Sequence, residues 1–218
     1  MHIKGSDTLL FIGDSITDAG RDRADSASLG NGYVDAVAQT LRERAQGGTA
    51  TAPRVINRGI SGNRVYDLES RWATDCIGLR PTVVTVKIGI NDTWRYYDSG
   101  LPSPVDAFEA CLGGLLADTA EQLSARLVVI TPFLLPVTPE QEGWFEDLAP
   151  RTDAVLRAAL AHGADVVRAD HVLNRAAQER EAVELARDGV HPSPLGHRLI
   201  ADAWLAAVDA AEPEPQRQ

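Results

Sequence analysis

Short apolar runs alternate along the chain with longer segments of helical periodicity. Runs rich in β-branched and aromatic residues predict buried strands, and they cover residues 8–12, 54–57, 82–88, 127–130 and 165–168. Apolar residues three and four positions apart predict helices, and they cover residues 33–44, 67–79, 104–124, 145–161 and 194–208. Residues 171–187 have only a weak helical pattern. Because strand and helix alternate, we expect a parallel sheet with helices on both faces.

No interior change of composition divides the 218 residues. A chain of this length can bury one good core, so we expect a single domain over residues 1–210. The polar, proline-interrupted residues 211–218 predict a flexible C-terminal tail. The predicted fold is an α/β, flavodoxin-like three-layer α/β/α sandwich around a five-stranded parallel sheet.

Composition and charge argue against several classes of function. Hydrophobic residues make up 44% of the chain and no apolar run reaches the length that spans a bilayer, so a membrane role has no support. Residues 1–7 contain no basic region, extended apolar segment or cleavage site, which predicts a cytoplasmic protein. The net charge of −10 argues against nucleic acid as a partner and favours a small neutral substrate.

The sequence offers few groups for binding a metal or a cofactor. Cys76 and Cys111 lie in apolar helical contexts, so we expect reduced core residues rather than a disulfide or a metal pair. No Cys/His cluster has the spacing of a zinc site. Neither Gly-x-Gly-x-x-Gly nor a glycine-rich run ending in Gly-Lys-Ser/Thr occurs, which leaves nucleotide binding with little support. We therefore expect chemistry without a metal or a cofactor.

The first predicted strand ends in Gly13-Asp14-Ser15. The glycine allows a sharp exit from the strand, and this exit exposes Ser15 at the carboxyl edge of the sheet, where open α/β proteins bind ligands. Taken alone, Asp14 and Ser15 fit a turn or a helix cap better than a nucleophile. A nucleophilic serine also needs a base, an orienting acid and donors for an oxyanion.

Two further predicted strands end in polar segments at the same edge, one containing Gly62 and the other Asn91. The backbone amides of Ser15 and Gly62 and the side-chain amide of Asn91 can supply three donors to a tetrahedral oxyanion. Considered singly, Gly62 and Asn91 are better explained as turn residues. Their recurrence at consecutive strand ends favours the oxyanion hole.

His191 is the best candidate for the base among the five histidines. Asp188 precedes it by three residues and can fix the tautomer of the imidazole and stabilise the imidazolium. The alternative is a helix-capping Asp188 with a surface histidine. His197 falls within the predicted C-terminal helix, where we expect it to pack or to face solvent.

Together these segments resemble the SGNH, or GDSL, hydrolases. The resemblance rests on four blocks in the order of that family, namely Gly13-Asp14-Ser15, Ile60-Ser61-Gly62, Gly89-Ile90-Asn91-Asp92 and Asp188-Gly189-Val190-His191. It spans residues 11–197 and implies a serine esterase with the SGNH hydrolase fold. By this resemblance Ser15 is the nucleophile, His191 the base and Asp188 the acid that orients it. Gly62 and Asn91, with the amide of Ser15, are the oxyanion donors.

Within that superfamily the blocks look most like those of bacterial intracellular acetylxylan esterases, in residues 11–18, 57–63, 88–94 and 131–133. This likeness implies an acetylated xylo-oligosaccharide or another small acetylated sugar as substrate, and it implies homo-oligomers. Trp94, Tyr96 and Tyr97 follow Asn91 and can form an aromatic wall for a sugar, although core packing explains them nearly as well. Of these, we take Trp94 and Tyr96 as candidate substrate-binding residues. Arg187 stands where these esterases usually have a tryptophan, and we take it as a third candidate substrate-binding residue.

Two other functions stay open from the sequence. The same catalytic set would serve a lysophospholipase, a thioesterase or a general aryl or short-chain esterase. A binding or scaffold protein with an idle Ser15 belongs to another class, and the presence of both Asp188 and His191 argues against it. We expect a carboxylic ester hydrolase that removes short acyl groups.

Overall fold

A computed structural model describes residues 3–47 and 51–210, so the predicted tail at 211–218 lies outside the described residues. Five parallel strands form one sheet in the order β2-β1-β3-β4-β5. This order confirms the predicted flavodoxin-like sheet, with its switch point between β1 and β3. The strands are β1 (Thr8–Gly13), β2 (Arg54–Gly59), β3 (Val83–Lys87), β4 (Arg126–Ile130) and β5 (Asp165–Val167).

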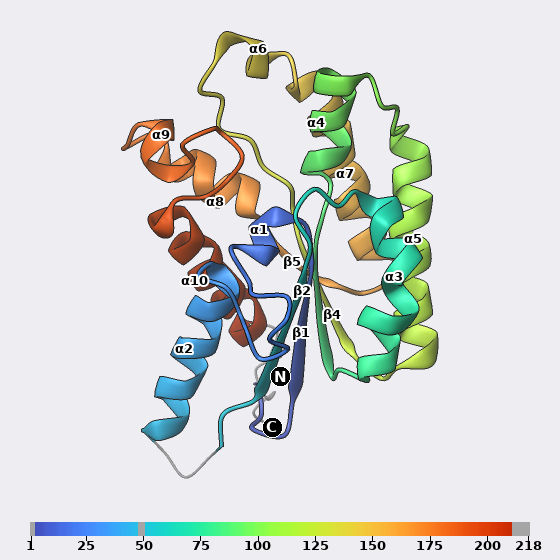
Figure 1. The fold of residues 1–218 in the computed structure, drawn as a ribbon, viewed down its shortest axis with the longest axis vertical. Helices are drawn as coiled ribbons and strands as arrows, with labels where there is room; N and C mark the ends of the chain where they lie inside the picture. Colours follow the sequence, from blue (N-terminus) through green and yellow to red (C-terminus); the bar gives the residue numbers. More distant parts are fainter. Residues whose placement is uncertain (1–2, 48–50, 211–218) are drawn as a thin grey trace, which may run out of the picture.

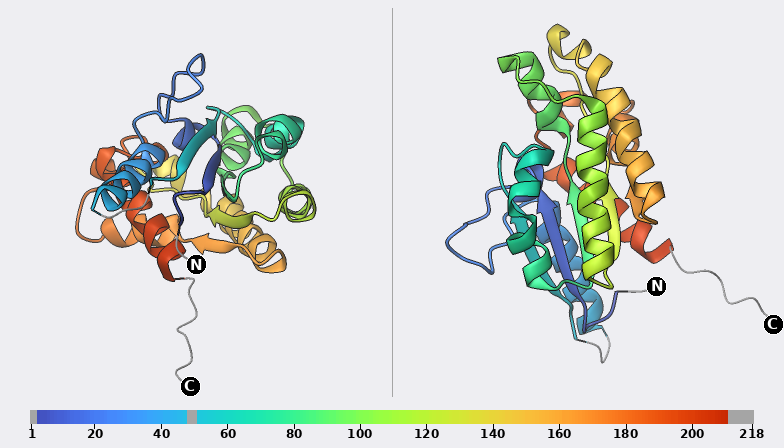
Figure 2. Two further views of the ribbon diagram at one scale, coloured as in Figure 1. Left: turned by 90° about the horizontal axis from the view of Figure 1, so that it is seen from below. Right: turned by 90° about the vertical axis from the view of Figure 1, so that its right-hand side faces the viewer.

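Helices cover both faces of the sheet, as Figures 1 and 2 show. One face carries α2 (Tyr33–Gln46), α8 (Ala169–Ala176) and α10 (Pro194–Ala210), and the other carries α3 (Val65–Asp75), α5 (Val105–Gln122) and α7 (Phe145–Ala161). The remaining helices are α1 (Ser15–Asp18), α4 (Ile90–Ser99) and α6 (Pro139–Glu142), which follow β1, β3 and β4, and α9 (Ala182–Leu185), which lies between α8 and α10. A 3₁₀ turn, Ile77–Leu79, follows α3.

Two hydrophobic clusters lie between the sheet and its helices because successive residues of a strand point to opposite faces. In β3, Val83 belongs to the cluster beneath α2 and α10, while Val84 and Val86 belong to the cluster beneath α3, α5 and α7. On the first of these faces Thr85 accepts a hydrogen bond from the indole N–H of Trp204 (3.0 Å). Each fully buried Val, Leu or Phe side chain in these layers contributes roughly 1.5–3 kcal/mol.

The structure differs from the sequence prediction at residues 67–79 and at residues 90–99. Residues 67–79 do not form one helix, because Cys76 leaves helical geometry and Arg80 turns the chain with a φ of +48° before Pro81. Residues 90–99 form α4, which the sequence did not predict. The first four residues of α4, Ile90 to Thr93, are all buried, so no polar and apolar alternation marks the helix.

Expectations from the sequence also concern the cysteines, membrane-spanning helices and the number of domains. Cys76 and Cys111 are free thiols, as expected. Within the described residues, no helix is both long enough and apolar enough to pass through a bilayer. The single domain over residues 1–210 stays a prediction.

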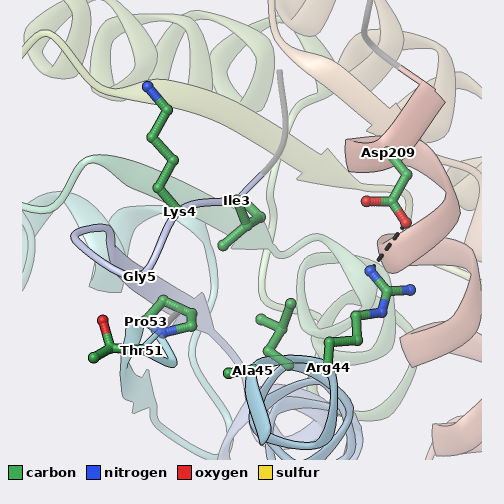
Figure 3. A pocket seen from close by; sticks show the side chains of 9 residues that line it. Ile3, Lys4, Gly5, Arg44, Ala45, Thr51, Pro53 and Asp209 are labelled. Carbon is green, nitrogen blue, oxygen red and sulfur yellow. Dashed lines mark hydrogen bonds and ion pairs between the residues drawn. The ribbon is translucent and has the colours of Figure 1, made fainter. Parts of the chain in front are cut away.

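A cavity of about 440 Å³ lies at the amino ends of β1 and β2, the end of the sheet opposite to Ser15 (Figure 3). It lies between the segment before β1, the segment before β2 and the ends of α2 and α10. Arg44 and Asp209 form an ion pair across its wall (3.0 Å). The residues that line this cavity belong to none of the four sequence blocks, which all lie at the carboxyl edge of the sheet.

Candidate active site

Ser15 is the first residue of α1, directly after the turn that ends β1. Gly13 must be a glycine because a Cβ there would lie 2.1 Å from the carbonyl oxygen of Lys87 in the neighbouring strand. Close packing of two strands, rather than an unusual backbone angle, therefore explains this glycine. Asp14 then caps α1, and its Oδ1 accepts a hydrogen bond from the amide of Ile16 (3.0 Å).

A continuous hydrogen-bonded chain joins Ser15, His191 and Asp188. Ser15 Oγ lies 2.9 Å from His191 Nε2, and His191 Nδ1 lies 2.6 Å from Asp188 Oδ2. With the proton on Nδ1 donated to the carboxylate, Nε2 is free to accept the proton of the serine hydroxyl. This arrangement can turn the serine into a nucleophile.

Asp188 is held as an ionised acceptor. Its Oδ1 accepts hydrogen bonds from the amides of Val190 (3.0 Å) and His191 (2.7 Å). Partial burial raises the pKa of Asp188, but these amides and the ring of His191 outweigh it and place the pKa below its usual value. The carboxylate is therefore charged at neutral pH and can stabilise an imidazolium at His191.

The loop that carries Asp188 and His191 is fastened to residues 132–144. The amide of Leu135 donates to the carbonyl of Gly189 (2.9 Å). The buried Gln141 donates from Nε2 to the carbonyl of Asp188 (2.7 Å) and accepts at Oε1 from the amide of Val137 (2.8 Å). Gln141 is a site residue that the sequence analysis missed, and no motif or periodicity marks it.

The structure brings the three predicted oxyanion donors to one edge. Gly62 has a φ of +87°, which favours glycine, and a Cβ there would meet no atom within 4 Å. Asn91 donates one N–H of its side chain to the carbonyl of Asn63 (3.0 Å), which leaves its second N–H available. Within residues 3–47 and 51–210, the amides of Ser15 and Gly62 donate to no other protein group. In the part of the chain that the structure describes, each of the three groups thus keeps one N–H without a protein acceptor.

A guanidinium group ties the Gly62 loop to the ends of β1 and β2. Arg71 donates to the carbonyls of Gly13 (3.2 Å) and Arg58 (2.9 Å) and to the side-chain oxygen of Asn63 (2.9 Å). It also pairs with Asp75 (2.8 Å). Because the planar guanidinium group binds several acceptors at once, Arg71 sets the position of the loop. This second missed residue lies on α3, away from every recognised block.

Asp92, beside Asn91 in sequence, has a structural role. It accepts hydrogen bonds from the hydroxyl of Ser103 (2.9 Å) and the amide of Val65 (3.3 Å). Burial raises the pKa of Asp92 to about 6. The side chain joins α4 to the start of α3, so of the pair only Asn91 is placed to serve an oxyanion.

Aromatic side chains extend from His191 toward solvent. The ring of Trp94 lies 5.8 Å from that of His191 and 5.7 Å from that of Trp144. Tyr97 stacks on Trp144 (5.7 Å between centroids, 14° between planes). The half-exposed Tyr96 packs edge-on against Tyr97 rather than beside His191. Trp94 is thus next to His191, Tyr96 is further out, and Trp144 is a neighbour that sequence analysis missed.

Two remaining predicted residues have clear positions. Arg187 is exposed, directly before Asp188. His197 is partly buried and accepts a hydrogen bond from the amide of Tyr33 (3.2 Å), whose ring stacks on it. Burial, with the nearby charge of Lys87, lowers the pKa of His197 to about 4. A neutral, packed His197 agrees with the predicted packing role.

Comparisons with known proteins place the chain in a family. The model of the GDSL-like lipase/acylhydrolase family matches residues 11–199. The chain belongs to this family. It is 36% identical to an acetylxylan esterase of Geobacillus stearothermophilus, over 95% of this chain and 96% of the relative. It is therefore a carboxylic ester hydrolase of the SGNH/GDSL type.

Solved structures show the same fold. The crystal structure of Axe2, an acetylxylan esterase from Geobacillus stearothermophilus, superposes with a TM-score of 0.87 at 34% identity and covers 100% of both chains. LAE5, an α/β hydrolase enzyme from the metagenome of Lake Arreo, Spain, has a TM-score of 0.86 at 33% identity and covers 97% of this chain and 99% of its own. The fold and the family are thus shared over nearly the whole chain.

Proposed function

We propose that this esterase removes acetyl groups from small acetylated sugars, with acetylated xylo-oligosaccharides preferred, through an acyl-enzyme on Ser15. The observation that carries the proposal is the hydrogen-bonded chain from Ser15 through His191 to Asp188. It lies at the carboxyl edge of the sheet, beside three unused hydrogen-bond donors.

In the first half-reaction Ser15 Oγ attacks the ester carbonyl while His191 Nε2 takes its proton. Asp188 stabilises the imidazolium that forms. The negative charge on the tetrahedral oxygen is met by the amides of Ser15 and Gly62 and by Asn91 Nδ2. Collapse of the intermediate breaks the bond to the sugar oxygen, which leaves as an alcohol with the proton from His191.

In the second half-reaction a water molecule takes the place of the sugar alcohol. His191 Nε2 accepts a proton from the water as it attacks the acyl carbonyl, and the same donors meet the new oxyanion. Collapse of this intermediate breaks the bond to Ser15 Oγ, which takes the proton back from His191, and acetic acid leaves and ionises to acetate in water. These steps use the chain's own residues, and the absence of a metal or cofactor requirement stays a prediction.

Several features support a sugar ester over a lipid or a thioester. The relative with 36% identity and Axe2 are both named acetylxylan esterases. The Trp94 ring lies beside His191, where an aromatic face can contact a sugar ring. Tyr96 and Arg187 are exposed further along the rim and are proposed outer contacts. The cytoplasmic location and the homo-oligomer stay predictions from the sequence and the family resemblance.

The test is acetate release from acetylated xylo-oligosaccharides, measured beside hydrolysis of p-nitrophenyl acetate and of a long-chain p-nitrophenyl ester. Wild type and Ser15→Ala are compared. Fast acetate release that depends on Ser15 supports both mechanism and substrate. Activity on p-nitrophenyl acetate alone keeps the mechanism and rejects the sugar, a preference for the long-chain ester favours a lipase-like substrate, and no activity on any ester favours a binding protein.

A further inference from the structure

A buried ion pair lies directly beside the turn that carries Ser15. Lys87 is the last residue of β3 and is paired in register with Gly13, the last residue of β1. Its Nζ lies 3.1 Å from Oδ2 of Asp14, and both side chains are 0% exposed. On its other side the ammonium faces the ring of Phe133, 5.7 Å from the centroid. Removing two opposite charges from water is costly, so the pair is weak as a source of stability alone.

Asp14 places a negative charge next to the proposed oxyanion hole. One carboxylate oxygen accepts the amide of Ile16, while the other meets Lys87. The amide of Ser15, a proposed oxyanion donor, lies between Asp14 and Ile16 in the chain. A carboxylate without a counter-charge at this place would oppose negative charge on the tetrahedral intermediate, and the dry surroundings would strengthen that repulsion.

Within the described residues, the other titratable side chains around the pair form no ion pair with Asp14, and Arg71 reaches only the main-chain carbonyl of the preceding Gly13. Tyr33 of α2 is buried and its hydroxyl bonds to Thr17. His197 of α10 is held neutral by burial and by the charge of Lys87. His191 carries positive charge only after it has taken the proton of Ser15. Among the described residues, Lys87 is the one salt-bridge partner of Asp14.

We propose that Lys87 is a positioning residue for ester hydrolysis, which neutralises the buried Asp14 carboxylate so that an oxyanion can form beside the Ser15 amide. The inference rests on the proposed role of Ser15 as nucleophile. Lys87 acts through Asp14 and the nucleophile turn, not by contact with substrate. Neither the sequence blocks nor the resemblance to the family assigns it this role.

The test compares kcat and KM for p-nitrophenyl acetate in Lys87→Met, Lys87→Gln and the double variant Asp14→Asn/Lys87→Met. Methionine keeps the length of lysine without charge, and glutamine adds a hydrogen-bond donor without charge. Thr85→Val is the matched control. Thr85 is buried on the same face of β3 as Lys87, and the substitution removes its buried hydrogen bond from Trp204. Ser15→Ala in the same assay reports on the proposed function itself.

We expect Lys87→Met and Lys87→Gln to lower kcat and kcat/KM together by about tenfold or more, with KM nearly unchanged, since the lost interaction belongs to the transition state. The double variant regains most of that loss because the opposing charge is gone. Thr85→Val keeps wild-type kcat even where its unfolding temperature falls. If Lys87→Met does not fold, Lys87→Gln and the double variant carry the same comparison.

Three results would overturn the inference. Wild-type kcat in Lys87→Gln would show that the charge is not needed. A double variant as slow as the single variants would show that removing the opposing charge brings no recovery. An equal loss of kcat in Thr85→Val would reduce the effect to general damage. Full activity of Ser15→Ala would instead reject the proposed function, whatever the Lys87 variants do.

Discussion

Ser15 and His191, the proposed nucleophile and its proposed base, are held in very different surroundings. Asp14, which precedes Ser15, and Lys87, which pairs with it, are completely buried between the sheet and its helices. The side chains of His191 and Asp188 are 45% and 46% exposed on a loop at the rim. That loop depends on hydrogen bonds from residues 132–144, above all those of Gln141 and Leu135.

This difference separates two sources of precision in one site. The position of Ser15 follows from strand packing, because the main-chain contacts of Gly13 with β3 leave no space for a side chain. The position of His191 follows from a small number of polar contacts that water can replace. We therefore expect substitutions around Ser15 to affect the fold as well as the rate, and substitutions around His191 to affect mainly the rate.

The largest effect is expected from substitution of the exposed His191. His191→Gln should lower kcat/KM for p-nitrophenyl acetate by about 10⁴, because the serine loses its base. Circular dichroism and the unfolding temperature should stay near wild type, since the ring is exposed. His171→Gln changes an exposed histidine on α8 and should keep full activity. Retained activity in His191→Gln would contradict the assignment.

Arg71→Met tests how the loop that carries Gly62 is held against the ends of β1 and β2. Loss of the guanidinium group removes the hydrogen bonds to the carbonyls of Gly13 and Arg58 and to the side chain of Asn63. Misplaced donors should lower kcat by roughly tenfold to a hundredfold with little change in KM. Arg157→Met, on a surface pair with Glu109, is the control and should stay within about twofold. Equal rates in both variants would show that Arg71 does not position the oxyanion donors.

Gln141→Ala should have a smaller effect, because Gly189 still accepts from Leu135 when the bond to Asp188 is lost. We expect kcat to fall by about fivefold, as one neutral hydrogen bond is removed. Amide hydrogen exchange in residues 132–144 and 186–192 should rise in the same variant. Gln39→Ala on the surface of α2 should change neither reading. Unchanged exchange in Gln141→Ala would show that the loop is fixed by other contacts.

The least effect on activity, and a clear effect on stability, is expected for His197→Gln. The folded-state pKa of His197 is about 4, against 6.5 without the fold. Between these values the unfolded chain binds a proton that the folded chain refuses, so the free energy of unfolding falls as the pH falls. The variant should lose this dependence, which amounts to about 1.4 kcal/mol per pH unit at most.

Chemical denaturation from pH 7 to pH 4 measures the effect as the difference between wild type and His197→Gln. The difference cancels the opposite contribution of Asp92, whose pKa is raised to about 6 and which favours the folded state as the pH falls. Parallel curves for the two proteins would contradict a neutral, buried His197.

The sequence was most informative where chemistry and backbone geometry demand one residue type. At Ser15, Gly62 and His191 the prediction rests on demands that few residue types meet, namely those of a proposed nucleophile, a left-handed turn and a proposed base. The sequence also marks Gly13, although as a sharp exit from the strand, whereas the structure explains it by a tight contact with β3. The sheet could be predicted because its five apolar runs are short and separated by long helical segments.

The rest depends on contacts between distant segments. Gln141 and Asp188 are 47 residues apart and share one side-chain bond, which leaves no local pattern to read. Arg71 lies on α3 and donates hydrogen bonds to carbonyls at the ends of β1 and β2. The helix at Ile90–Ser99 begins with four buried residues, so its periodicity is hidden by the same burial that places Asn91.

The most direct test of the account is labelling with a fluorophosphonate, followed by peptide mapping of the adduct. Such a reagent reacts with an activated serine, so the account predicts one adduct on Ser15, formed in step with the loss of esterase activity. Ser15→Ala should show no adduct, and His191→Gln should react far more slowly. An inactivated enzyme labelled at another residue, or a Ser15→Ala variant that still hydrolyses and still reacts, would contradict the account.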